Sequence, residues 1–188
     1  MKVMDYLDNY YNTKPFFGKG GGMQADNVKV YLGPFDLYVP NLDQRKRLIP
    51  YHDLHHIVSG YNNSRIGEGE VSAWELGTGC LSKPLAAFYD LTGFATGLMY
   101  SPKRVYEAFI RGRKSSNFYG IPLETMMTKE MATLSEFSQN SRNIDSKILN
   151  NSLFLAYCFG AVAISITFIP VYILNRVSIK IGITKVST

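Results

Sequence analysis

The sequence contains little cysteine, and it lacks the compositional bias of a disordered or fibrous chain. Its 188 residues include only two cysteines, Cys80 and Cys158, which are too few for a disulfide framework or a cysteine-based zinc site. Apolar residues make up 46% and charged residues 19% of the chain, which excludes an intrinsically disordered or collagen-like protein. The length fits one domain with a small appendage. The net charge is a mild +5 and no recognition motif accompanies it, so we expect no nucleic-acid partner.

The N-terminus also lacks the apolar segment of a secretory signal, because Asp5 and Asp8 arrive too early. One long hydrophobic run is present near the other end, where residues 153–174 contain no charged residue. A helix of about 20 apolar residues is long enough to cross the hydrocarbon core of a bilayer. We therefore predict a transmembrane helix over residues 149–175 and a tail over residues 176–188, with a long buried core helix as the alternative.

This hydrophobic run predicts a single-pass membrane protein. Basic residues lie on both sides of it, with Arg142 and Lys147 before and Arg176 and Lys180 after, so the positive-inside rule does not settle the orientation. Because no signal peptide is recognised, we expect the bulk of the chain on the cytoplasmic side of a bacterial inner membrane. The mitochondrial inner membrane is the alternative location.

Residues 1–40 are expected to form an N-terminal segment with a short helix and a small β-hairpin. Apolar residues alternate over 28–39 and are interrupted by Gly33 and Pro34, a pattern typical of two strands joined by a tight turn. The glycine-rich stretch 18–22 lacks the spacing of a phosphate-binding loop. We expect it to be a connector.

Residues 41–148 are expected to form a helical domain, so the predicted fold class is mainly α. We predict a short helix up to Leu48 with Asn41 as its N-cap. A separate helix should begin at Pro50, which suits a first helical turn, and end at Gly60. Further helices are predicted from Glu68 past Trp74 with a loosened end at 77–79, and over 82–99, 102–113 and 123–137.

All three histidines of the chain lie in one short stretch, as His52, His55 and His56. His52 and His56 are four residues apart on a predicted helix, which places them on one face at a spacing that lets two imidazoles share a metal ion. Glu68 is the candidate third ligand, because only a short loop separates its helix from theirs. Asp53 is either a fourth ligand or an acceptor that orients a histidine N–H. His55 points to another side of the helix and is not expected to be a ligand.

The small number of histidines excludes three other kinds of metal protein. Membrane desaturases need several histidine boxes, phosphohydrolases of the HD type need a further histidine upstream, and ferritin-like di-iron proteins need two Glu-x-x-His pairs. Two histidines and a carboxylate suit zinc, and they also suit iron and manganese. Zinc is our first expectation. The alternative is that these histidines are ordinary surface or core residues.

The spacing of these residues resembles the signature of the coenzyme Q biosynthesis protein 4 family. His52-Asp53-x-x-His56, eleven further residues and then Glu68 match the pattern H-D-x-x-H-x11-E. A looser similarity extends over residues 28–138. Its further matches are Gly60, Gly67, Trp74-Glu75, Arg111-Gly112-Arg113 and Asn117-Phe118-Tyr119-Gly120. The chain departs from the family in being short and in carrying its own C-terminal apolar segment.

The resemblance implies a mainly helical fold that holds a divalent metal at His52, Asp53, His56 and Glu68. It also implies a role in ubiquinone biosynthesis, in which the C1 carboxyl group of a prenylated aromatic ring is removed or oxidised. The chain would then be a metal-dependent decarboxylase or lyase, with Asp53 and Glu68 as candidate catalytic residues. The alternatives are a non-catalytic scaffold or lipid-presenting subunit with a structural metal, and an unrelated membrane protein that keeps a relict metal site.

The expected partners are membrane lipid, a prenylated quinone precursor, other quinone biosynthesis enzymes and a second copy of this chain. Small and aromatic residues over 85–100 are able to line an apolar groove for a prenyl chain, although ordinary helix packing explains them equally well. Basic residues over 45–47 and 103–114 suit an anionic lipid surface, with solvated helix faces as the alternative. Glu70 and Glu75 are further acids near the predicted site that are able to move a proton.

Overall fold

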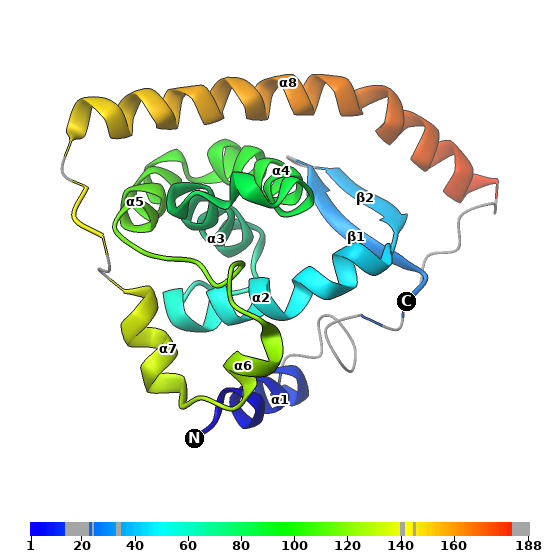
Figure 1. Cartoon of the computed structure of the whole chain (residues 1–188). Coiled ribbons are helices and arrows are strands. Elements are labelled where there is room, and N and C mark those ends of the chain that lie inside the picture. The colour runs from blue at the N-terminus through cyan, green and yellow to red at the C-terminus, as the bar shows by residue number, and fades with distance from the viewer. Residues whose placement is uncertain (14–22, 24, 33–34, 140–141, 145, 182–188) are drawn as a thin grey trace.

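The structure is a computed structural model that describes all residues except 14–22, 24, 33–34, 140–141, 145 and 182–188. It is mainly helical, with a small two-stranded sheet near the N-terminus and one long apolar helix at the C-terminus (Figure 1). The predicted mainly α class is therefore confirmed. In chain order the elements are α1 (Val3–Thr13), β1 (Asn27–Leu32), β2 (Phe35–Pro40), α2 (Asp43–Ser59), α3 (Arg65–Thr78), the short 3-10 turn η2 (Cys80–Ser82), α4 (Pro84–Tyr100), α5 (Pro102–Arg113), α6 (Leu123–Met127), α7 (Met131–Ser138) and α8 (Lys147–Lys180).

The predicted β-hairpin is confirmed in its two strands. β1 and β2 pair in antiparallel register, with Val28 opposite Val39 and Lys29 opposite Tyr38. The predicted turn at Gly33 and Pro34 and the glycine-rich connector at 18–22 lie outside the described residues. β1 packs against α4, which brings the hairpin to the helical domain.

α2 is one continuous helix, so the prediction of two helices separated at Pro50 was wrong. A proline inside a helix removes a hydrogen bond and costs about 3 kcal/mol, but Ile49, Pro50 and Leu54 are all buried here and their packing offsets that cost. Asn41 does not cap the helix. Its amide donates to the Ala25 carbonyl at 2.8 Å instead.

The C-terminal end of α2 agrees with the sequence-based prediction. Gly60 has the positive φ of 77°, a conformation that glycine adopts without strain, and its N–H donates to the His56 carbonyl at 2.9 Å. Because α2 is continuous, Arg45 lies on the same helix as His52 and His56.

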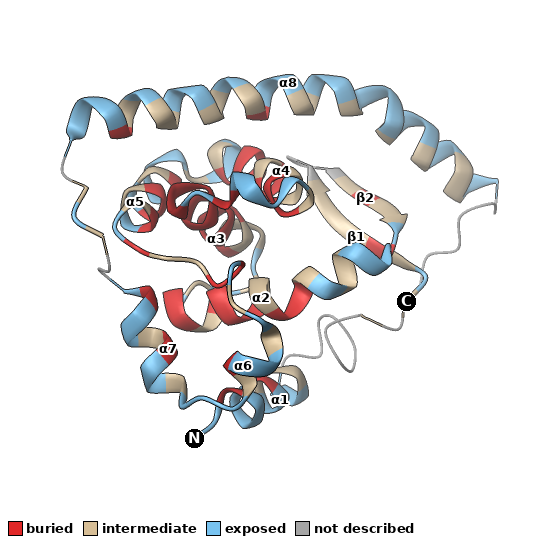
Figure 2. Ribbon diagram, in the orientation of Figure 1, coloured by how far each residue is buried: buried red, intermediate tan, exposed pale blue. Residues whose placement is uncertain are grey.

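α3 is the most deeply buried helix, and every residue from Gly69 to Thr78 is buried (Figure 2). It begins at Arg65, earlier than predicted, because the Ser64 side chain caps it by accepting from the Gly67 N–H at 3.1 Å. Its glycines let neighbouring backbones approach: a Cβ atom at Gly69 would lie 2.4 Å from the Cα atom of Gly97 on α4. Gly77 makes a similar approach to α5. The helix ends within the predicted stretch 77–79, with Gly79 in the left-handed conformation, but Gly77 and Thr78 are helical and not loosened.

The predicted helix over 123–137 is divided into α6 and α7. The break has a clear cause, because the backbone between the two helices bonds to the start of the chain. The Val3 N–H donates to the Lys129 carbonyl at 2.9 Å, and the Met131 N–H donates to the Met1 carbonyl at 3.1 Å. These long-range bonds require a backbone conformation at this point that a continuous helix cannot supply.

α8 contains 34 residues and is long and apolar enough to cross a membrane. It includes residues 176–180, so the predicted tail begins as helix, and the rest of that tail from 182 onward lies outside the described residues. The helix lies across α4 and α5 and reaches β2 at its far end (Figure 1). Phe154 packs between the rings of Phe94, Tyr106 and Phe109, so the N-terminal half of α8 completes a hydrophobic core.

Hydrogen bonds connect both ends of α8 to the rest of the domain. Near the first end, Asn150 accepts from Arg113 Nε at 2.9 Å. Near the other end, Asn175 donates to the Tyr38 carbonyl at 2.7 Å and accepts from the Tyr38 N–H at 3.2 Å. The helix is therefore attached along its length to the domain that contains the histidines.

Candidate metal centre

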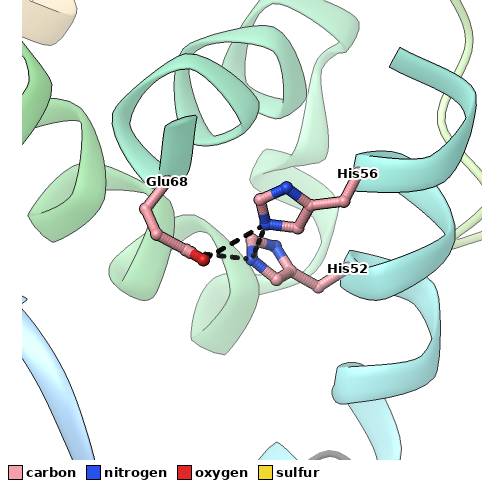
Figure 3. A group of neighbouring side chains, drawn as sticks. All are labelled: His52, His56 and Glu68. Carbon is pink, nitrogen blue, oxygen red and sulfur yellow. Dashed lines mark hydrogen bonds and ion pairs between the residues drawn. The ribbon is translucent and has the colours of Figure 1, made fainter. Parts of the chain in front are cut away.

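Two helices bring His52, His56 and Glu68 together. The histidines project from α2 and the carboxylate projects from the first turns of α3 (Figure 3). The Nε2 atoms of the two histidines are 3.2 Å apart. Glu68 Oε2 lies 3.3 Å from His52 Nε2, and Glu68 Oε1 lies 3.4 Å from His56 Nε2. Three donor atoms bound to one tetrahedral ion at about 2.1 Å would be separated by about 3.3–3.4 Å. The observed spacing therefore fits one shared metal ion.

The hydrogen bonds on the far sides of both rings direct their Nε2 atoms toward this common point. His52 Nδ1 lies 2.9 Å from Glu75 Oε1, and His56 Nδ1 lies 3.0 Å from the Tyr61 carbonyl oxygen. An ionised carboxylate and a carbonyl only accept hydrogen bonds, so each Nδ1 carries the hydrogen. In the neutral rings each Nε2 then presents a lone pair, as a metal ligand requires.

Glu68 Oε1 provides an independent sign that a cation belongs between these groups. This oxygen is buried and has no hydrogen-bond partner among the residues that the structure describes. It lies 3.4 Å from His56 Nε2 without a hydrogen bond, and a buried carboxylate oxygen that accepts no hydrogen bond is costly. A metal ion at the common point would satisfy it together with the two imidazole lone pairs, so the residues present fit a divalent metal.

Glu75 lies behind the three candidate ligands and orients His52. Its carboxylate is fully buried and is bonded through both oxygens. Oε1 accepts from His52 Nδ1 and from His55 Nδ1 at 2.7 Å, and Oε2 accepts from the Tyr119 hydroxyl at 2.6 Å. His55 uses its other nitrogen to accept from the Phe118 N–H at 3.0 Å. Both nitrogens of His55 therefore have protein partners, and neither is left to bind a metal.

The charges of this network favour a positive ion. Burial alone would lower the pKa of His52, but the carboxylates of Glu75 and Glu68 raise that pKa well above its usual value. Burial likewise works against the two carboxylates, yet the neighbouring histidines lower the pKa of both Glu68 and Glu75. Without metal, one proton on His52 therefore faces two carboxylates. A divalent ion in its place would balance both negative charges and release that proton.

Asp53 lies beside the candidate ligands, but its carboxylate is not among the donor atoms that converge on one point. It lies on α2 and lines the same cleft as His52 and Glu68, whereas the convergent donor atoms belong to His52, His56 and Glu68. Its Oδ2 atom is buried and has no hydrogen-bond partner within the described part of the chain. Burial raises the pKa of this carboxyl, which favours its protonated form.

Sequence reasoning missed Asp90. This residue on α4 lies close to His52 and Glu75, with donor atoms of the three within 4.8 Å of one another. Burial and the nearby Glu75 carboxylate raise the pKa of Asp90 well above its usual value. The Cys80 thiol donates to Asp90 Oδ2 at 3.1 Å. One signal was available in the sequence, because Asp90 is the sole charged residue of the segment 84–100.

The other predicted acid, Glu70, has a structural partner away from the cluster. Arg104 donates to its two carboxylate oxygens at 2.8 and 2.6 Å. This bidentate geometry is the strong form of an arginine–carboxylate pair. Of the two acids considered for proton transfer, Glu75 therefore lies in the candidate centre and Glu70 joins α3 to α5.

A cleft leads from the candidate metal centre. Its walls come from β1, α2, α3 and α4, and its lining is largely apolar and aromatic. Residues of the segment 85–100 that were expected to line a groove do contribute to it. The lining residues are Lys29, Val30, Tyr31, Arg45, Leu48, Ile49, His52, Asp53, Glu68, Ser72, Ala86, Tyr89, Asp90, Thr92, Gly93 and Tyr119. An amphipathic ligand with an apolar body suits such a lining.

Comparison with known proteins assigns no family to this chain. No family model matches it, and neither a curated protein nor a solved structure matches it. The resemblance to the coenzyme Q biosynthesis protein 4 family therefore depends on the residues quoted above and stays a prediction. The geometry of the cluster is an observation on this chain and does not depend on that resemblance.

Proposed function

We propose that this chain is a metal-dependent protein of quinone biosynthesis that removes the C1 carboxyl group from a prenylated aromatic acid at a membrane surface. The observation that carries the proposal is the convergence of His52 Nε2, His56 Nε2 and the Glu68 carboxylate, whose Oε1 atom has no hydrogen bond within the described residues. Three protein ligands leave a position open, as metal sites that act on substrates do. The apolar cleft and the apolar helix α8 support a hydrophobic substrate.

His52, His56 and Glu68 would hold the ion, with zinc as the first candidate and iron or manganese as alternatives. When bound, the ion supplies a Lewis acid for the carboxyl group of the substrate. Loss of CO2 breaks the bond between C1 and the carboxyl carbon and leaves the electron pair on C1. A proton must then take the vacated position. Asp53 would deliver that proton, because its buried carboxyl lines the cleft beside the ligands and has a raised pKa.

The test uses a prenylated 4-hydroxybenzoic acid labelled with 13C in its carboxyl group. Wild-type protein loaded with zinc, iron or manganese is expected to release 13CO2, and mass spectrometry of the ring shows whether hydrogen or, with O2 and a reductant supplied, hydroxyl replaces the carboxyl. The Asp53→Asn variant should keep its metal and lose about 10²-fold or more in rate. Binding of metal and substrate without any 13CO2 would contradict the enzyme proposal and favour the scaffold alternative.

We further propose that α8 attaches the chain to the membrane through its outward face. That face carries no charge between residues 155 and 174, and its large exposed side chains include Leu155, Phe159, Ile166 and Leu174. A helix that crossed the bilayer would place Asn150 and Asn175 at opposite membrane surfaces, yet both bind the same domain. Attachment with α8 lying along the membrane surface keeps these bonds, and we prefer it to the crossing arrangement expected from the sequence.

The Ile166→Arg variant is expected to weaken binding to liposomes by at least about tenfold, because arginine in hydrocarbon costs about 2.5–3.5 kcal/mol. Met4→Arg is the matched control. Met4 is 50% exposed and Ile166 is 62% exposed, but Met4 lies on α1, on the side of the molecule opposite α8 (Figure 1). Sedimentation with liposomes measures both. Equal loss in the two variants, or none in Ile166→Arg, would contradict attachment through this face.

A further inference from the structure

Arg45 is a cation in the cleft that has no carboxylate partner. It lines the same cleft as the candidate metal ligands. Its Nη1 donates to the Asn41 side-chain oxygen at 3.0 Å, and its guanidinium carbon lies 5.8 Å from the centre of the Tyr89 ring. Among the residues that the structure describes, Arg45 forms no ion pair. A guanidinium offers five N–H donors, and the bond to Asn41 uses one of them.

Burial makes this arrangement costly. Loss of solvent lowers the pKa of Arg45, and the nearby acidic side chains of Tyr89, Asp53 and Glu68 oppose that effect without an ion pair to the guanidinium. Two other arginines have carboxylate partners: Arg65 pairs with Asp36 at 2.8 Å and Arg104 pairs with Glu70. A half-buried cation without such a partner is expected where a ligand supplies the anion.

The position of Arg45 relative to the candidate metal is fixed by the helix that carries both. Arg45, His52 and His56 lie on α2, and seven residues separate Arg45 from His52. Seven residues are two turns of an α-helix, so the two side chains start from one face about 10 Å apart along the axis. Leu48 and Ile49 lie between them and line the cleft. The cleft therefore has a cationic end, an apolar middle and a metal-binding end.

We propose that Arg45 binds a second oxyanion of the ligand, distinct from the group that meets the metal, and that on an aromatic acid this oxyanion is a ring phenolate. This proposal builds on the proposed function. The carboxyl group would face the metal ligands, the ring would lie against the apolar residues between, and the ring oxygen remote from the carboxyl would accept hydrogen bonds from Arg45. A fixed cation would select hydroxylated rings, because a ring without that oxygen leaves Arg45 buried and unpaired.

The test uses 2-geranylphenol, which has no carboxyl group, and protein stripped of metal with a chelator. The ultraviolet spectrum of the bound phenol reports its ionisation. We expect the phenol bound to wild-type protein to have a pKa at least about one pH unit below that of the free phenol, because an opposite charge in contact with an acid lowers its pKa by about 1–3. At a pH below both values, this is about a tenfold gain in the ionised fraction. Arg45→Gln should remove this change while the phenol still binds. Arg47→Gln, an exposed arginine two residues away, should keep it.

Three outcomes would overturn the proposal. The first is a phenol pKa that wild-type protein leaves unchanged, and the second is a fall that persists in Arg45→Gln. The third is displacement of the phenol by dodecyl phosphate without any ionisation of the phenol, which would assign Arg45 to a lipid phosphate. Because neither metal nor CO2 release enters this measurement, its failure is distinguishable from a failure of the proposed decarboxylation.

Discussion

Replacing Glu75 with glutamine is expected to lower the free energy of unfolding by about 3–5 kcal/mol, the cost of breaking a buried charged network. Glu75 is fully buried, and its two oxygens accept from His52, His55 and the Tyr119 hydroxyl. A glutamine offers one oxygen and an NH2 group in place of two acceptors. At least one donor would lose its partner, and a donor–donor contact would form in its place.

The same change should weaken metal binding by about 10–100-fold, the usual effect of losing the group that orients a histidine ligand. Denaturant unfolding and a zinc titration measure the two effects. Tyr119→Phe is a milder variant of the same network, because it removes only one hydrogen-bond donor to Glu75. It should lower the free energy of unfolding by about 1.5–3 kcal/mol. Glu136→Gln, at an exposed acid on α7, should change neither quantity. A Glu75→Gln protein with wild-type stability and zinc affinity would contradict the role assigned to this carboxylate.

Adding a divalent metal to the chelator-treated protein is expected to raise its free energy of unfolding. A ligand that binds only the native state contributes about 4 kcal/mol when its free concentration is 1,000 times its dissociation constant. In the metal-free protein Glu68 Oε1 is buried without a hydrogen-bond partner in the described chain, and the metal would supply that partner. Thermal or denaturant unfolding at fixed free metal concentration measures the gain.

Two variants distinguish a metal ligand from a residue that only lies beside the metal centre. His56→Ala should lose nearly all of the metal-induced gain, because one of three convergent donor atoms is gone. Asp53→Asn should keep most of it, because Asp53 lies outside that group although the sequence-based expectation included it. A gain in His56→Ala equal to that of wild type would contradict the site, and a complete loss in Asp53→Asn would restore Asp53 as a ligand.

The sequence predicted the candidate centre better than it predicted the helix boundaries. His52 and His56 are four residues apart, and a helix brings such a pair to one face whatever surrounds it. Glu68 follows after a loop too short to carry it far away. The division of α2 at Pro50 failed because intrinsic propensity cannot register the burial of Ile49, Pro50 and Leu54, and that packing decides the outcome.

Other features depend on contacts between distant parts of the chain. The break between α6 and α7 arises from bonds to Met1 and Val3, and no local pattern reveals such bonds. Asp90 reaches the site only because α4 packs closely on α3 through Gly69 and Gly97. The hydrophobic run predicted a long apolar helix, but its attachment to β2 through Asn175 depends on tertiary structure.

Elemental analysis of the detergent-purified protein shows whether His52, His56 and Glu68 hold a metal ion. Wild type, His56→Ala and Glu68→Gln would be reconstituted with zinc, iron or manganese, passed through a desalting column and measured by mass spectrometry. We expect close to one metal ion per wild-type chain and a large loss in both variants, with folding checked by circular dichroism. No bound metal in wild type, or equal metal in folded variants, would contradict a metal centre at His52, His56 and Glu68.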